Sequence, residues 1–148
     1  MSSANPKAGA NNAHFADVTE LAGQKISAEQ LERTCNRYYW ARPFVENGDI
    51  LEAGCGAGQG LGYLAQHARS VVAGDISAEV MSRAQHTYGD AIDLKVFDAT
   101  SIPWPDKSFD AVLLFEAIYY LPDVDAFFQE ARRVLRPGGH LLIATANK

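Results

Sequence analysis

The sequence has few cysteines, few basic residues and no long apolar run, and each shortage excludes a class of protein. Two cysteines, Cys35 and Cys55, cannot form a disulfide-rich scaffold, and we expect both to be unpaired in a reducing, cytoplasmic compartment. No apolar run reaches the length of a membrane span, and the first residues lack the basic and apolar regions of a secretory signal. Lysine and arginine number 13 against 18 aspartates and glutamates, a net charge of −5, which disfavours binding to nucleic acid or to an anionic membrane.

Histidine is also scarce, and the four histidines are scattered. His14, His67, His86 and His140 show none of the spacings at which zinc ligands recur, so no metal site is expected. What the sequence does contain is enough apolar material for one core. Its 148 residues make one domain, and 47% of them are hydrophobic.

Ordered structure is expected after an initial stretch of small and polar residues. Residues 1–25 are rich in Ala, Asn, Ser and Gly, and they predict a flexible N-terminal arm ahead of a single domain over 26–148. Ser27 and Gln30 form a capping-box pattern that predicts the start of a helix. Aromatic and apolar residues then recur at helical spacing, and Pro43 and Gly48 are expected to close the segment.

Downstream of this helix, strand-like and helix-like segments alternate, which is typical of parallel βαβ units and of an α/β fold. Strands are expected near Asp49–Ala53, Ser70–Gly74, Asp93–Phe97, Ala111–Phe115 and His140–Thr145. Helices are expected at Leu61–His67, Ala78–Tyr88 and Val124–Leu135. The segment 136–139, Arg-Pro-Gly-Gly, predicts a turn between the last helix and the last strand.

The run from Ile50 to Gly60, ILEAGCGAGQG, carries the strongest functional signal. A short strand breaks into alternating glycines, which permit left-handed backbone angles and the close approach of a ligand. The helix that follows presents unpaired N–H groups and the positive end of its dipole, so a nucleotide-like ligand is indicated. Glu52 at the strand tip would repel a pyrophosphate and attract a ligand that carries an ammonium and a sulfonium. The glycine spacing also departs from the G-x-G-x-x-G pattern of nicotinamide binders.

The E-x-G-x-G-x-G pattern resembles the first motif of class I S-adenosylmethionine (SAM)-dependent methyltransferases of the small-molecule type. Further motifs follow in order: Asp75 ends the second strand, Asp98 and Ala99 follow the third, and residues 134–143 lead into the fifth. The resemblance implies a Rossmann-like, doubly wound sheet with five parallel strands in the order 3-2-1-4-5. Complete members have two further strands, so we interpret the chain as a C-terminally truncated catalytic core.

The resemblance also implies the cofactor, SAM, with S-adenosylhomocysteine (SAH) as product, and the residues that hold it. The cofactor-binding residues that it implies are Arg37, Tyr38, Glu52, Gly54, Gly56, Gly58, Asp75, Ile76, Asp98, Ala99 and Phe115. Among them the glycines would cradle the methionine half, and Asp75 would accept hydrogen bonds from both ribose hydroxyls. Asp98 would accept from the adenine amine, and Arg37 would face the methionine carboxylate. The alternative for Arg37 is a solvated side chain on a helix packed against the domain.

The loop after the fourth strand is expected to reach the methyl acceptor. Glu116 and Tyr119 are the candidate catalytic residues in it, although the position where the family often has histidine holds Tyr119 or Tyr120 here. The alternative is that both tyrosines belong to the core and that Glu116 is solvated. Because methyl transfer depends mainly on positioning, the absence of an imidazole base does not oppose the assignment.

Three functions remain open at this point. The first is methyl transfer from SAM to a small-molecule acceptor of unknown identity, without nucleic-acid or membrane partners. The second is a SAM-binding core without turnover, and the third is a nicotinamide-dependent oxidoreductase. The last strand, Leu141–Thr145, would form an apolar edge without proline or charge, so a homodimer through that edge is expected unless the N-terminal arm covers it.

Overall fold

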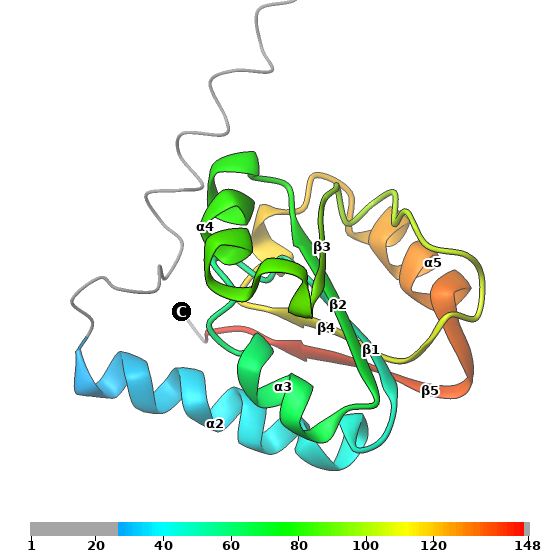
Figure 1. Cartoon of the computed structure of the whole chain (residues 1–148). Coiled ribbons are helices and arrows are strands. Elements are labelled where there is room, and N and C mark those ends of the chain that lie inside the picture. Colours follow the sequence, from blue (N-terminus) through cyan, green and yellow to red (C-terminus); the bar gives the residue numbers. More distant parts are fainter. Residues whose placement is uncertain (1–26, 147–148) are drawn as a thin grey trace, which may run out of the picture.

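The computed structural model describes residues 27–146 as a five-stranded sheet with helices on both faces (Figure 1). The predicted N-terminal arm over 1–25 lies outside the described residues. The elements are, in chain order, α2 (Ala28–Val45), β1 (Asp49–Ala53), α3 (Leu61–His67), β2 (Ser70–Asp75), α4 (Ala78–Tyr88), the 3₁₀ turn η1 (Gly89–Ala91), β3 (Asp93–Val96), β4 (Phe109–Phe115), the 3₁₀ turn η2 (Ile118–Tyr120), α5 (Val124–Val134) and β5 (Leu135–Ala144).

All neighbouring strands are parallel, and their order is β3-β2-β1-β4-β5. The expected fold class and strand order are therefore confirmed. The order reverses beside β1, whose neighbours are β2 and β4. In open α/β sheets ligands bind beyond the carboxyl ends of the strands at such a reversal, and the glycine loop leaves β1 there.

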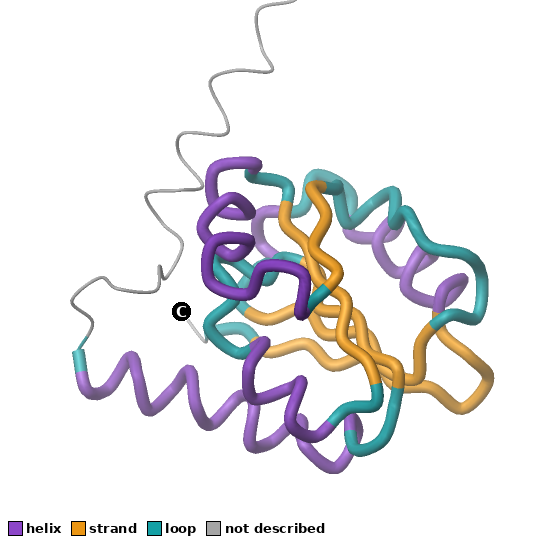
Figure 2. The backbone as a smooth tube through the Cα atoms, viewed as in Figure 1, coloured by secondary structure: helices purple, strands orange, loops and turns teal. Residues whose placement is uncertain are grey.

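Helices lie on both faces of the sheet (Figure 2), and two clusters of apolar side chains hold them against it. One cluster packs α2, α3 and α4 on one face, where Ile50 and Leu113 meet Leu64 of α3. The other packs α5 and the segment 97–108 on the opposite face, where Leu51 meets Phe127. Because Ile50 and Leu51 alternate between the clusters, β1 is apolar on both sides, as a central parallel strand requires.

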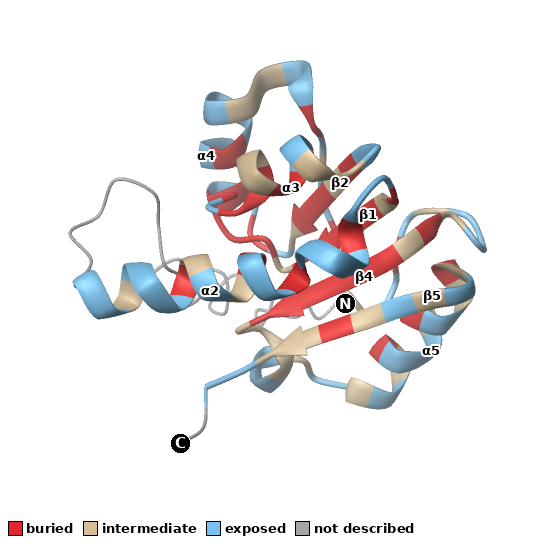
Figure 3. Ribbon diagram, turned by 90° about the horizontal axis from the view of Figure 1, so that it is seen from below, coloured by how far each residue is buried: buried red, intermediate tan, exposed pale blue. Residues whose placement is uncertain are grey.

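Burial falls from the central strands toward β5 (Figure 3). Strand β4 is buried along nearly its whole length, whereas only Leu142 of β5 is buried. Within residues 27–146, no strand pairs with the outer edge of β5. None of the helices in this part of the chain has the length and apolarity of a membrane span.

The helix starts agree with the capping signals. The Ser27 hydroxyl accepts from the Gln30 N–H at 3.1 Å while the Gln30 side chain accepts from the Ser27 N–H at 2.9 Å, so the predicted capping box is present. Helix α2 includes Pro43 and ends at Val45, before Gly48, so it ends between the two residues that are expected to close the segment. Proline removes one backbone donor there, and the position near the end of the helix limits the loss to its last turns.

The Arg-Pro-Gly-Gly segment also differs from the predicted turn. Helix α5 runs directly into β5 at Leu135, and the pairing with β4 then shifts, so that Phe109 lies opposite Leu135 but Ala111 lies opposite His140. Residues 136–139 form a bulge inside the strand, and Gly138 at φ 79° supplies the left-handed angle that it requires. Strand β5 therefore begins five residues earlier than expected.

Candidate functional site

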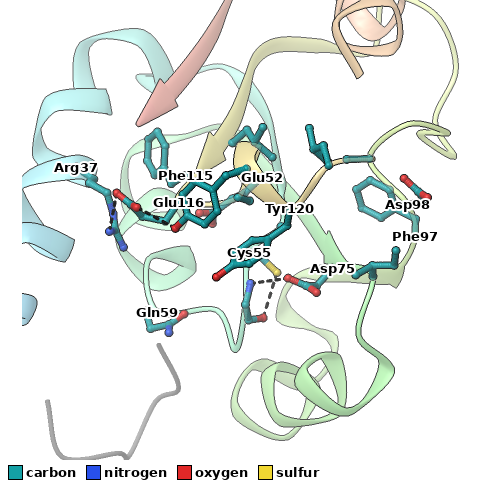
Figure 4. A pocket seen from close by; sticks show the side chains of 18 of the residues that line it. Arg37, Glu52, Cys55, Gln59, Asp75, Phe97, Asp98, Phe115, Glu116 and Tyr120 are labelled. Atoms are coloured by element: carbon teal, nitrogen blue, oxygen red, sulfur yellow. Dashed lines mark hydrogen bonds and ion pairs between the residues drawn. The ribbon is translucent and has the colours of Figure 1, made fainter. Parts of the chain in front are cut away.

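A cavity lies beyond the carboxyl ends of β1, β2 and β4, where the predicted ligand residues meet (Figure 4). The cavity is lined by Arg37, Tyr38, Glu52, Gly54, Cys55, Gly56, Gln59, Asp75, Ile76, Phe97, Asp98, Ala99, Leu114, Phe115, Glu116, Ala117, Tyr119, Tyr120, Leu121 and Pro122. Every site residue expected from the sequence is among them except Gly58. The view in Figure 4 places Arg37 and Glu116 on one side and Phe97 and Asp98 on the other, with Asp75 between.

The glycine loop takes the left-handed angles that its sequence predicts. Gly54, Gly56 and Gly58 have φ values of 66°, 59° and 86°. A β-carbon on Gly54 would lie 3.0 Å from the β-carbon of Ala117, so a side chain at this position would crowd the loop after β4. The loop is thus a cradle that a side chain would partly fill.

Gly58 supports the loop from behind the cavity. The Tyr88 hydroxyl, at the end of α4, donates to the Gly58 carbonyl at 2.5 Å and accepts from the Gly62 N–H at 3.2 Å. A β-carbon on Gly58 would lie 2.8 Å from the Tyr88 ring. No local sequence pattern points to this role of Tyr88, because nothing near it in the chain distinguishes its hydroxyl from that of another tyrosine at a helix end.

Glu52 is a buried carboxyl group at the floor of the site. Its side chain is 1% exposed, and its Oε1 accepts a hydrogen bond from the Tyr38 hydroxyl at 2.6 Å. Its other oxygen, Oε2, is buried and has no hydrogen-bond partner. Burial raises the pKa of Glu52 to about 7, against the opposing effects of the Tyr38 hydrogen bond and the nearby Arg37 charge. Burial also raises the pKa of Tyr38, so the phenol keeps the proton that it donates.

Asp75 lies at the tip of β2 and faces the glycine loop. Its Oδ2 accepts from the Gly56 N–H at 3.1 Å, and its Oδ1 accepts from the Ser77 N–H at 3.0 Å. Burial raises the pKa of Asp75, and these backbone donors oppose that shift. Because each carboxylate oxygen has two lone pairs, both can accept a further hydrogen bond from a ligand.

The far end of the cavity combines one carboxylate with apolar groups. Asp98 Oδ1 accepts from the backbone N–H and the hydroxyl of Thr100, at 2.8 and 2.7 Å, which fixes the turn after β3. Ile76, which is 41% exposed, and Phe97, which is buried, both contribute apolar surface to the lining. A planar aromatic ligand group fits between such apolar surfaces, with the Asp98 carboxylate at its edge.

Glu116 joins three elements at the near end of the cavity. Its Oε1 lies 3.6 Å from Nη1 of Arg37 on α2. Its Oε2 accepts from the Tyr119 hydroxyl at 3.2 Å and from the Ala146 N–H at 3.1 Å. The structure therefore brings Arg37 and both candidate catalytic residues together, and it places Tyr119 at the rim, 48% exposed, rather than in the core.

The residues present fit a ligand of the predicted kind. An acceptor atom without a partner, Glu52 Oε2, lies at the bottom of a cradle made by glycine, and a guanidinium from Arg37 lies near it. An amino-acid ammonium could donate to Glu52 Oε2, and an amino-acid carboxylate could pair with the Arg37 guanidinium. The described residues contain no group of three or more His, Cys, Asp or Glu side chains arranged to hold a metal ion.

Comparison with known proteins agrees with this geometry. Residues 51–143 match the methyltransferase domain family. A protein of Mycolicibacterium smegmatis described as a probable S-adenosylmethionine-dependent methyltransferase is 38% identical over 100 residues, which are 68% of this chain and 38% of that protein. A fatty-acid O-methyltransferase of the same organism is 38% identical over 109 residues, 72% of this chain and 40% of its own.

A solved structure extends the likeness to a liganded protein. Phosphoethanolamine N-methyltransferase 1 of Haemonchus contortus, in complex with phosphoethanolamine and SAH, superposes with a TM-score of 0.69 at 27% identity, covering 79% of this chain and 26% of that one. The chain spans about 40% of the length of the two curated relatives. The family match covers more than half of the chain, and the sheet order is the one that the family motifs imply. The chain therefore belongs to the class I S-adenosylmethionine-dependent methyltransferases.

Proposed function

We propose that the cavity binds SAM and that the protein transfers its methyl group to a small-molecule acceptor. The observation that carries this proposal is the buried, unpartnered Oε2 of Glu52 beneath the glycine loop. Leaving such an atom unsatisfied costs about 1–3 kcal/mol or more for a charged group, and a ligand ammonium would recover that cost. A pyrophosphate, by contrast, would meet an unfavourable charge at this position.

Each part of the ligand has a counterpart in the lining. Arg37 and Glu52 would hold the carboxylate and ammonium of the methionine half, while the Gly54 and Gly56 backbone lies along it. Asp75 would accept from the ribose hydroxyls with the lone pairs that the loop leaves available. Ile76, Phe97, Asp98 and Ala99 would enclose the adenine, with the Asp98 carboxylate accepting from its amine.

The chemistry requires little from the protein beyond positioning. When bound, SAM supplies an electrophilic methyl group on a sulfonium. Glu116 and Tyr119 lie at the cavity rim, and their hydrogen bond holds a carboxylate where an acceptor's leaving proton could be received. The neighbouring Tyr120 and Leu121 would limit the access of water and hold an acceptor near the methyl group.

The mouth of the cavity supports a small acceptor with an apolar part. Tyr119 and Tyr120 both line the cavity and are exposed, and their rings stack edge to face with centroids 4.6 Å apart. The relatives named above act on a fatty acid and on phosphoethanolamine, so the family does not fix the acceptor. The family match opposes a nicotinamide-dependent oxidoreductase, and the comparisons give no support to a core that binds SAM without turnover.

Calorimetric titration with SAH, SAM and NAD tests the proposal. SAH and SAM should bind, and NAD should bind more weakly than either. A methylation assay with labelled SAM and a panel of fatty acids, phenols and amines would then identify the acceptor class. Tighter binding of NAD than of SAH would contradict the assignment. The test is the rank order of the three affinities, because the absolute affinities depend on how much of the site these residues form.

Partners and compartment are part of the same proposal. Self-association through the outer edge of β5 is proposed because no strand pairs with that edge among residues 27–146. Cys35 and Cys55 are both free thiols, which is compatible with the predicted cytoplasmic compartment. The expectation that the protein has no nucleic-acid partner rests on its net charge of −5.

A further inference from the structure

Glu116 has a backbone conformation that needs support. Its φ of 52° lies in the left-handed region, which a residue other than glycine adopts only at an energetic cost. Its N–H donates to the Ala144 carbonyl at 2.7 Å, which ties the residue to the end of β5. Strained residues of this kind concentrate at functional sites, so the side chain that this conformation directs is of interest.

That side chain is held by two different kinds of contact. Oε2 accepts two hydrogen bonds, from Tyr119 and from Ala146. Oε1 faces Arg37 at 3.6 Å, which is longer than the usual distance of a charge-assisted hydrogen bond. The carboxylate can therefore lose Arg37 and still keep the bonds of its other oxygen.

The charged side chains that line the cavity offer a ligand carboxylate a single favourable position, next to Arg37. Among the lining residues, all of which belong to the described part of the chain, Arg37 is the single cationic side chain. Four carboxyl groups share the same lining: Glu52, Asp75, Asp98 and Glu116. Arg37 is already committed in part, because it faces Glu116 and both side chains are largely shielded, 15% and 27% exposed.

We propose that Glu116 stands in for the ligand carboxylate on Arg37, and that a methionine-type ligand exchanges with it on that guanidinium. The inference rests on the proposed function. In the ligand-free site, the Glu116 carboxylate neutralises the charge of Arg37, and this ion pair holds α2 against the loop after β4. Once the ligand carboxylate takes over Arg37, the Glu116 carboxylate is an anion paired only through neutral donors, and it faces the acceptor side of the cavity together with Tyr119. Cofactor binding would thus prepare the acceptor site.

The exchange makes an unusual prediction: removal of an acidic residue from the site should tighten binding. In Glu116→Gln the amide oxygen can still accept from Tyr119 and Ala146, but the charge that competes for Arg37 is gone. Partly exposed ion pairs are weak, so SAH affinity should rise about two- to fivefold. Affinity for 5′-deoxy-5′-methylthioadenosine, which lacks the amino-acid group, should be unchanged. Glu116→Asn, whose side chain favours left-handed angles, is the second variant in case the first folds poorly.

A double-mutant cycle by calorimetry separates exchange from a general effect of charge. Arg37→Gln should weaken SAH binding and leave the methylthioadenosine affinity unchanged, and adding Glu116→Gln to it should produce no further gain. Tightening that persists in the Arg37→Gln background, or that appears equally for methylthioadenosine, would overturn the exchange. Wild-type protein that binds SAH but shows no gain on Glu116→Gln would overturn it as well, while leaving the proposed function intact. Failure of the wild type to bind either ligand would instead overturn the proposed function.

Discussion

The ring of Tyr38 lies against the α-carbon of Gly60, so closely that a β-carbon on Gly60 would fall 1.8 Å from Cζ of Tyr38. The Tyr38 hydroxyl reaches past this glycine to Glu52 at 2.6 Å. The ring cannot move aside without losing that hydrogen bond, which is the one that the structure gives to the Glu52 carboxyl group. Because Gly60 has no side chain, Tyr38 of α2 can reach Glu52 in the lining of the site.

Gly60→Ala should consequently destabilise the fold by about 1–3 kcal/mol, the usual cost of overpacking a filled interior. It should also weaken SAH binding, because Glu52 loses its donor when the ring is displaced. Gly62→Ala is the matched control: a β-carbon there has no neighbour closer than 3.7 Å, and the residue lies within α3. Alanine in a helix is favoured over glycine by up to about 1 kcal/mol, so this variant should be neutral or stabilising. Equal losses in urea denaturation of both variants would contradict the role of Gly60.

Removal of the Asp75 carboxylate should affect both the ligand and the loop. Asp75→Ala should lose about 1.5–3 kcal/mol of SAH binding per charged hydrogen bond, at least a tenfold weakening. Because Gly56 and Ser77 also donate to this side chain, stability should fall as well. Asp75→Asn keeps a side-chain oxygen that can accept from one of these donors. In this variant the loss of SAH affinity can therefore be measured with a smaller loss of fold stability. Unchanged SAH affinity in Asp75→Asn by calorimetry would remove the ribose assignment.

The two outer strands of the sheet formed by residues 27–146, β3 and β5, differ in how their edges are protected. Strand β3 is short and carries Asp93 and Lys95, which discourage pairing with another chain, whereas residues 141–144 of β5 are uncharged. Phe44 of α2 lies beside the middle of β5, where its ring centroid is 5.1 Å from that of His140, and Trp40 packs on Phe44 with ring centroids 5.9 Å apart. We expect a concentration-dependent increase in mass by sedimentation equilibrium. The exposed-surface variant Trp40→Lys should weaken it, and a monomer at all concentrations would contradict self-association through the edge of β5.

The features of the fold and the site that depend on short sequence patterns could be predicted from the sequence. The strand order followed from motifs that recur at fixed places in the family, and the glycine angles at Gly54 and Gly56 followed from the loop pattern. The roles of Gly60 and Tyr88 depend on side chains that are distant in the chain, and no local pattern reports such a contact. The bulge after Leu135 was missed because a Pro-Gly-Gly segment marks a departure from regular structure without saying whether it is a turn or a bulge.

Glu52 should release a proton when the site binds its ligand. Its pKa of about 7 in the fold lies above its usual value of about 4.5, so its contribution to the stability of the ligand-free fold is full below pH 4.5 and is lost as the pH rises through about 7. A ligand ammonium favours the carboxylate and lowers this pKa, so SAH affinity should increase between about pH 5.5 and 7.5 and then level off.

Calorimetry at pH 6.5 in buffers of different ionisation enthalpy should record net proton release. Asp75 is also buried and its pKa is raised, so Glu52→Gln identifies the share that belongs to Glu52. That variant should bind SAH more weakly and release fewer protons, and release equal to that of the wild type would show that the titrating group is not Glu52.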